Sequence, residues 1–207
     1  MKIEYNTSSQ AVNYLDAVAL MEKRAEDIYQ AKVPELVWFL EHPSIYTAGT
    51  SASVDELINP KDLPVYESGR GGKYTYHGPG QRIIYLMLDL RKREADLKKY
   101  IANLENWIIA SLAEIGLSSR RKEGHVGIWT TSNSGEDAKI AAIGIRVRKW
   151  ITYHGISINV HPSMEYYNGI IACGIKEFGV TSLNKLGYNI TYSELDHILK
   201  GKFNDFF

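Results

Sequence analysis

The chain has 207 residues, enough for one hydrophobic core, so we expect a single domain over residues 1–207. Charged residues make up 23% and apolar residues 44% of the sequence, a composition typical of soluble globular proteins. The 24 Lys and Arg side chains balance the 24 Asp and Glu side chains, which excludes the overall basic field of a nucleic-acid-binding protein.

The sequence also indicates a cellular compartment. Its single cysteine cannot form an internal disulfide. The first residues lack the apolar core of a signal peptide, and no run reaches the roughly 18 apolar residues of a membrane span. We therefore expect a cytoplasmic protein with no membrane partner.

The first predicted element is an amphipathic helix over residues 10–29, which Ser8 or Ser9 would cap. Its charged residues leave one side apolar, and we expect that side to face the core. The apolar residues assigned to it are Val12, Leu15, Ala19, Leu20 and Ala25.

The rest of the chain alternates strands and helices without a regular order. This irregular alternation favours an α+β fold over a regular βαβ repeat. Strands are predicted over residues 35–40, 45–49, 65–67, 82–88, 126–130, 139–147 and 151–160, and helices over 94–115 and 192–200.

A glycine-rich loop over residues 70–81 is the most informative local feature. It contains four glycines and precedes the apolar strand at 82–88. Glycine lets the backbone approach a ligand closely, and loops held by a rigid scaffold often bind substrates. The loop matches neither the dinucleotide-binding nor the P-loop pattern. We interpret it as a binding loop of another kind.

Cys173 is the only cysteine and lies in an apolar segment. Such a cysteine is often a small buried side chain without a chemical role. Gly174 favours a functional interpretation, because it leaves a bare backbone N–H beside the sulfur that can hold an oxyanion. A thiolate is also a suitable acceptor for an acyl group from another thioester.

Lys139 and two histidines are candidates to assist this thiol. Lys139 opens a strand of small apolar residues, where it is either a surface lysine or a counter-charge and base. His77 and His154 are alternative bases, or polar residues that orient loops. The histidines are scattered without metal-ligand spacing, so we expect neither a metal nor another cofactor.

Although the total charge is balanced, basic residues form two local clusters, at residues 120–122 and 146–149. A charge run is usually a solvated face. The alternative is a docking patch for an acidic protein, since complementary charge speeds encounter.

Six segments of the chain resemble a known family, namely residues 41–49, 70–81, 139–144, 154–160, 172–175 and 180–183. Taken together, they resemble the lipoyl(octanoyl) transferases. The resemblance covers most of the chain in the same order, and the loop and the Cys-Gly-Ile segment are its most specific parts. Ala172 stands where proline commonly precedes the cysteine, and the turn Thr131–Asp137 is longer than usual.

The resemblance implies a two-step acyl transfer without ATP. An octanoyl group passes from acyl carrier protein to Cys173 as a thioester and then to a lysine of a lipoyl domain. Lys139 matches the lysine that lowers the cysteine pKa and exchanges protons. The implied substrate-binding residues are Arg70, Gly71, Gly72, Lys73, Tyr74, Thr75, Tyr76, His77, Ala142, Ile143, Gly144, Gly155, Ile156 and Ser157.

The resemblance also implies a fold and partners. The fold is a mixed sheet with flanking helices, similar to the catalytic domains of biotin and lipoate protein ligases. The donor is octanoyl-acyl carrier protein, and the acceptors are lipoyl domains of 2-oxoacid dehydrogenase E2 subunits and glycine cleavage H protein. We expect a monomer. An apolar slot of Ala141, Ala142, Ile143 and Gly144 suits a medium-length acyl chain.

Two other functions stay open at this stage. An ATP-dependent lipoate or biotin ligase would hold adenylate phosphates and would not need the cysteine. A non-catalytic module that binds acylated or lipoyl domains would keep the loop and the slot but tolerate the loss of Cys173.

Overall fold

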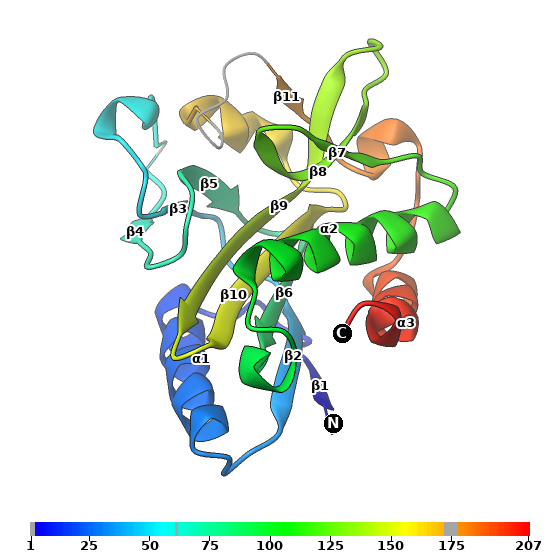
Figure 1. Ribbon diagram of the computed structural model, residues 1–207. Helices are drawn as coiled ribbons and strands as arrows, with labels where there is room; N and C mark the ends of the chain where they lie inside the picture. Colours follow the sequence, from blue (N-terminus) through cyan, green and yellow to red (C-terminus); the bar gives the residue numbers. More distant parts are fainter. Residues whose placement is uncertain (1–2, 61, 172–177) are drawn as a thin grey trace.

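The computed structural model describes residues 3–60, 62–171 and 178–207 (Figure 1). Its main feature is a sheet with the strand order β1-β2-β6-β10-β9-β8-β7, and β11 also pairs with β9. β1 is parallel to β2 and β11 is parallel to β9, whereas the other neighbours are antiparallel. The strands are β1 (Ile3–Thr7), β2 (Glu35–Leu40), β6 (Gln81–Met87), β7 (Arg120–Lys122), β8 (His125–Thr131), β9 (Asp137–Arg148), β10 (Ile151–Asn159) and β11 (Gly179–Val180).

A second, smaller sheet has the order β4-β3-β5. Its strands are β3 (Ile45–Ala48), β4 (Val65–Glu67) and β5 (Tyr74–His77). The sequence predicted a loop throughout residues 70–81, but β5 lies inside it and pairs antiparallel with β3. Tyrosine and threonine favour extended backbone, so this part of the segment forms a strand once β3 offers its edge.

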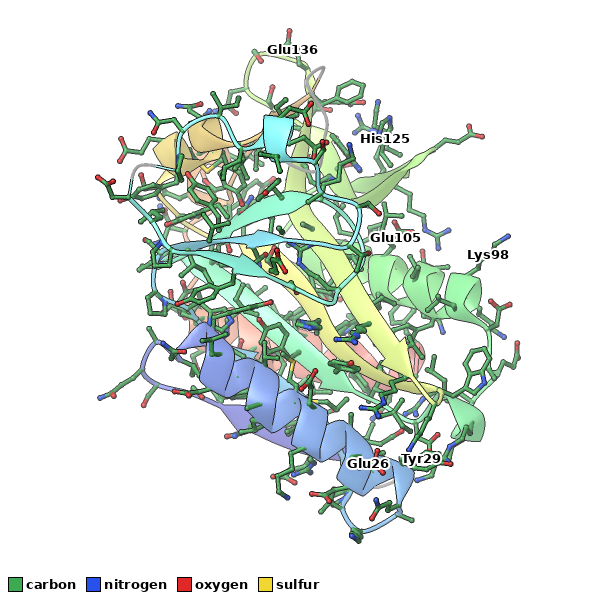
Figure 2. The ribbon with its side chains drawn as sticks, turned by 90° about the vertical axis from the view of Figure 1, so that its left-hand side faces the viewer. Glu26, Tyr29, Lys98, Glu105, His125 and Glu136 are labelled. Atoms are coloured by element: carbon green, nitrogen blue, oxygen red, sulfur yellow. The ribbon has the colours of Figure 1, made fainter. Side chains whose placement is uncertain are left out.

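Among the described residues, three α-helices cover the main sheet: α1 (Tyr14–Tyr29), α2 (Leu97–Glu114) and α3 (Tyr192–Lys202). Figure 2 shows α1 in front of the sheet, with the smaller sheet above it. α2 and α3 pack on the opposite face. Successive residues of a strand point to opposite faces. Phe39 and Ile84 therefore join the core under α2 and α3, and Trp38 and Ile83 join the core under α1. The mixed sheet and flanking helices confirm the predicted fold class.

The helix α1 differs from the prediction in its start and in its buried face. It begins after Asn13, whose side chain accepts a hydrogen bond from the Leu15 amide at 2.9 Å, and not after Ser8 or Ser9. Leu15, Ala19 and Leu20 are exposed, so the predicted stripe was wrong at these three positions. Ala25 is buried, and Val12, which precedes the helix, is partly buried against the same core. The residues that face the core are Tyr14, Ala17, Met21, Ala25 and Ile28.

The first basic cluster forms strand β7. Arg120 and Lys122 both bind the carboxylate of Asp137, which partly neutralises them. Lys149, in the second cluster, lies 3.3 Å from Glu26. Within the described ranges, no helix has the length and apolar character needed to cross a membrane.

Candidate active site

A cavity of about 300 Å³ lies between the main sheet and the residues that precede and form β5. Its floor consists of two cross-strand pairs of small residues on β9 and β10, Ala142 with Ser157 and Gly144 with Gly155. Because none of these side chains is large, open space remains above the sheet. The volume is at the lower end of the range for small-ligand pockets.

The other wall is the glycine-rich segment, and Arg70 fixes its shape. The buried Arg70 guanidinium donates hydrogen bonds to the carbonyl oxygens of Thr47 and Lys73 at 3.0 and 3.1 Å, and to the Thr47 hydroxyl at 2.6 Å. The Gly71 amide donates to the Ile145 carbonyl of β9 at 3.0 Å. A Cβ on Gly144 would lie 2.8 Å from Arg70 Cδ. Glycine at 144 therefore allows Arg70 to pack against the floor.

All but two of the predicted substrate-binding residues line the cavity, and Lys139 lines it too. Tyr74 and Tyr76 do not, because they alternate with Thr75 and His77 along β5 and pack into a separate aromatic cluster. Ala141 of the predicted apolar slot is buried in the core. Seven lining residues were not predicted, namely Tyr14, Ser51, Ile83, Tyr85, Gly124, His125 and Val126.

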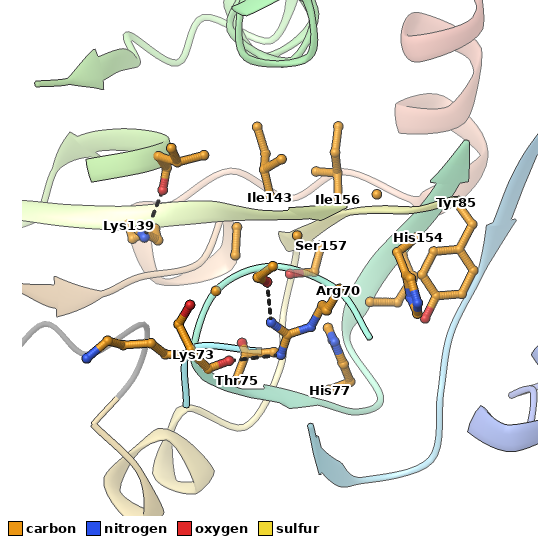
Figure 3. A pocket seen from close by; sticks show the side chains of 18 of the residues that line it. Arg70, Lys73, Thr75, His77, Tyr85, Lys139, Ile143, His154, Ile156 and Ser157 are labelled. Atoms are coloured by element: carbon orange, nitrogen blue, oxygen red, sulfur yellow. Dashed lines mark hydrogen bonds between the residues drawn. The ribbon is translucent and has the colours of Figure 1, made fainter. Parts of the chain in front are cut away.

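Two of the predicted residues contribute backbone more than side chain. Ile143 and Ile156 point away from the cavity in Figure 3 and pack with the core under α2 and α3. A strand places alternate side chains on opposite faces, so a run of consecutive lining residues cannot all offer side chains to a ligand.

Lys139 lies at one end of the cavity, on β9, and is only 6% exposed (Figure 3). Its Nζ donates a hydrogen bond to the Val126 carbonyl at 3.1 Å and lies 4.8 Å from the centre of the Trp129 ring. Lys139 is therefore buried, and the interpretation of this residue as a surface lysine is wrong.

Cys173 lies in segment 172–177, outside the described residues. The described residues on both sides of that segment are anchored near the cavity. On one side, the Ile171 amide donates to the Glu56 carbonyl at 2.8 Å, and the Glu56 carboxylate binds Lys73. On the other side, Val180 pairs with Lys139 in β11 and β9.

Three buried histidines gather at the end of the cavity opposite Lys139. The His42 Nδ1–H donates to the Val12 carbonyl at 2.7 Å, and the Tyr85 hydroxyl donates to His42 Nε2 at 2.7 Å. The His42 and His77 rings are 6.0 Å apart, and His154 contacts Tyr85 edge-on at 5.8 Å. Within the part of the chain that the structure describes, no group of His, Cys, Asp and Glu is arranged to hold a metal ion.

Burial keeps these imidazoles neutral. It lowers the pKa of His42 to about 4 and that of His154 to about 3, and the positive charge of Arg70 adds to the effect at His154. Burial, His42 and Arg70 hold the pKa of His77 well below its ordinary value. His77 and His154 are consequently weak proton acceptors at neutral pH.

His154 also has a left-handed backbone, with φ of +59°. Such a conformation is uncommon for residues other than glycine and is concentrated at functional sites. The Thr152-Tyr153-His154-Gly155 sequence gave no sign of it.

We expect the histidine cluster to make the protein sensitive to acid. A histidine whose pKa is lower when folded than when unfolded takes up a proton on unfolding, so the free energy of unfolding falls as the pH drops below about 6.5. For His42 alone, the loss reaches about 3 kcal/mol by pH 4, and the effect is absent above pH 7.5.

Urea unfolding of the wild type and of His42→Gln at pH 7.5 and pH 4 measures this loss. Glutamine offers an N–H to Val12 and an oxygen to Tyr85 without titrating. We expect the variant to lose markedly less stability between the two pH values. His197→Gln removes an exposed histidine and serves as the control. Equal losses in all three proteins would contradict the assignment to His42.

Comparison with known proteins identifies the class of protein to which this fold and cavity belong. Residues 13–204 match the family model described as lipoyl protein ligase A/B catalytic domain. Among solved structures, a bi-partite lipoate protein ligase from Thermoplasma acidophilum superposes with a TM-score of 0.73 at 14% identity, covering 99% of this chain and 83% of that one. A lipoate-protein ligase A crystallised with ATP gives 0.71 at 16% identity, covering 98% and 85%. At these identities the likeness shows the shared fold alone.

Curated sequences narrow the class further. An octanoyltransferase of Wolbachia pipientis subsp. Culex pipiens is 52% identical over 205 residues, 99% of both chains. One of Ehrlichia chaffeensis is 49% identical over 206 residues, 99% of this chain and 96% of that one. The chain therefore belongs to the lipoyl protein ligase A/B catalytic domain family and, within it, to the octanoyltransferases.

Proposed function

We propose that this octanoyltransferase acts through a thioester on Cys173, assisted by Lys139. Octanoyl-acyl carrier protein is the donor, and a lysine of a lipoyl domain is the acceptor. The observation that carries the proposal is the position of Lys139. Its amine is buried at one end of a cavity large enough for an acyl chain. The backbone of Lys139 pairs with Val180 in β11, the strand that follows the cysteine segment.

The reaction balances without another reactant. The Cys173 thiolate attacks the donor thioester carbonyl, the carbon–sulfur bond to the carrier breaks, and the carrier thiolate takes up a proton. The acceptor amine then attacks the acyl-enzyme, loses a proton, and releases the Cys173 thiolate as the amide forms. A charged Lys139 stabilises the thiolate in both steps and exchanges these protons.

The cavity supports an acyl chain as the bound group. Ala142, Gly144 and Gly155 present apolar atoms along the floor, so methylene groups can lie over the sheet. Each buried methylene contributes about 0.8 kcal/mol. Arg70 is held by Thr47 and Lys73, and we propose that it keeps the loop in the binding conformation.

The same proposal extends to partners and compartment. The acceptors are lipoyl domains of 2-oxoacid dehydrogenase E2 subunits and glycine cleavage H protein. The chain acts as a monomer of one catalytic domain. The single cysteine leaves the chain without an internal disulfide, as is usual in a reducing compartment, so we place the protein in the cytoplasm.

Intact mass after incubation with octanoyl-acyl carrier protein tests the proposal. We expect one octanoyl group on the protein without ATP, and its loss when a lipoyl domain is added. A requirement for ATP with an acyl-adenylate intermediate would favour a ligase instead. Binding of both partners without acyl transfer would favour a non-catalytic module.

Filling the floor of the cavity should reduce octanoyl transfer. In Ala142→Ile, the larger side chain occupies space that the acyl chain uses, so we expect KM for octanoyl-acyl carrier protein to rise about tenfold or more, the cost of two or more buried methylenes. Transfer of a shorter acyl group should be less affected. Ala113→Ile, at an exposed position of α2, is the control. An unchanged KM in Ala142→Ile would place the acyl chain elsewhere.

A further inference from the structure

Two buried side-chain amides connect the cavity to the chain on both sides of the cysteine segment. Gln81 is fully buried and Asn159 is 3% exposed. The Gln81 Nε2 and the Asn159 Oδ1 are 3.0 Å apart. Neither residue lines the cavity, so neither is explained by contact with a substrate.

Backbone carbonyl groups fix the orientation of both amides. Gln81 Nε2 lies 3.1 Å from the Tyr76 carbonyl, which can only accept a hydrogen bond. The nitrogen of Gln81 must therefore face Tyr76, and its oxygen must face His77. By the same argument, Asn159 Nδ2 faces the Thr181 carbonyl at 2.9 Å.

This orientation determines the tautomer of His77. Gln81 Oε1 lies 3.1 Å from His77 Nδ1, and an amide oxygen cannot donate. His77 must therefore carry its proton on Nδ1. The other ring nitrogen, Nε2, is left without a proton on a side chain that lines the cavity.

The amides also bind the described residues before and after segment 172–177. Before it, the Tyr167 hydroxyl lies 2.6 Å from Gln81 Nε2 and donates to Asn159 Oδ1 at 3.0 Å. After it, Thr181 accepts from Asn159, and its own amide donates to the Lys139 carbonyl at 3.0 Å. One buried cluster thus links His77, Lys139 and both flanks of the cysteine segment.

We propose that Gln81 and Asn159 are positioning residues of the transfer reaction: Gln81 fixes His77 as the Nδ1–H tautomer, and Asn159 fixes the flanks of segment 172–177 relative to Lys139. In this state His77 accepts a hydrogen bond from an N–H, O–H or S–H donor of the bound substrate. The catalytic part of this inference rests on the function proposed above.

Nitrogen-15 NMR of histidine-labelled wild-type protein tests the tautomer directly. We expect His77, assigned from the signal missing in His77→Asn, to show the Nδ1–H pattern and no titration between pH 5.5 and 8. The Nε2–H pattern, or titration in that range, would overturn the proposal. This readout does not depend on acyl transfer, so it separates a failure of the proposal from a failure of the proposed function.

Gln81→Glu tests the consequence for the reaction. The carboxylate keeps the shape but cannot donate to Tyr76 or Asn159, and it places a negative charge against His77 to oppose the influence of Arg70, His42 and His154. We expect kcat to fall at least tenfold with KM changed less than threefold, and a new pH dependence to appear between pH 5.5 and 8. A merely structural role would lower the unfolding temperature without moving the pH profile.

Two further variants test the proposal even if Gln81→Glu does not fold. Gln81→Met removes the hydrogen bonds without adding charge, and should lower kcat and mix the two tautomers of His77. Asn159→Leu should lower kcat while His77 keeps its tautomer. Asn103→Leu removes another amide that binds a backbone carbonyl, that of Phe206 at 2.8 Å, and should leave kcat unchanged. Wild-type kcat in either Gln81→Met or Asn159→Leu would overturn the role of that residue.

Discussion

Cys173→Ser is expected to abolish thioester formation and octanoyl transfer while the protein stays folded. The thiolate is the nucleophile, and a serine hydroxyl is almost entirely protonated at neutral pH without a strong adjacent base. The buried histidines do not supply such a base, because burial keeps the pKa of His77 and of His154 far below neutrality. We therefore expect the rate of transfer to fall to the uncatalysed background.

Intact mass and single-turnover transfer from octanoyl-acyl carrier protein measure this loss. Serine is nearly the same size as cysteine, so the urea midpoint should change little and serves as the control for folding. Transfer by Cys173→Ser at the wild-type rate would show that the acyl group never resides on this residue. Binding of the donor should survive the substitution, since the cavity is unchanged.

Lys139→Ala is expected to slow acylation of Cys173 by about 100-fold or more, the usual scale of a lost proton-transfer partner. The substitution removes the cation that favours the thiolate, so a larger share of Cys173 is protonated at neutral pH. The pH dependence of alkylation by iodoacetamide reports this directly. We expect its midpoint to move to higher pH in the variant.

Lys139→Arg separates the two roles of the side chain. Arginine keeps the positive charge but does not release a proton at this pH. We expect this variant to retain part of the alkylation at neutral pH and to transfer poorly to the acceptor. Charge and proton exchange would then be distinct contributions of one residue.

Lys122→Ala provides the matched control. Lys122 lies 5.8 Å from the same Trp129 ring that Lys139 contacts, but its amine binds Asp137 and it does not line the cavity. Its loss should leave the alkylation profile unchanged. An unchanged profile in Lys139→Ala as well would contradict the proposal that Lys139 assists Cys173.

The elements of the fold could mostly be predicted, and the exceptions have physical causes. The strands over residues 35–40 and 151–160 are short apolar runs, and the structure places β2 and β10 there. The buried face of α1 was predicted wrongly, because the prediction followed the large apolar residues Leu15 and Leu20, which are exposed. The residues that face the sheet recur at spacings of three and four, so their spacing identifies this face better than the hydrophobicity of single residues does.

The sequence by itself determined the family, because family membership depends on residue identity and order along the chain, and it led us to propose Cys173 and Lys139 as the reactive groups. The resemblance rests on six segments in the same order, of which the glycine-rich loop and the Cys-Gly-Ile segment are the most specific. The neutral state of the histidines was decided only by tertiary structure. His42, His77 and His154 lie far apart in sequence, and their low pKa values arise from burial beside one another and beside Arg70.

The same holds for Gln81 and Asn159. In the sequence Gln81 is the last residue of the predicted loop and Asn159 lies in a predicted strand, 78 positions away. Only the antiparallel pairing of β6 with β10, which places Gln81 opposite Asn159, brings the two amides into contact. A hydrogen bond depends on distance and direction in space, and neither is encoded locally at either residue.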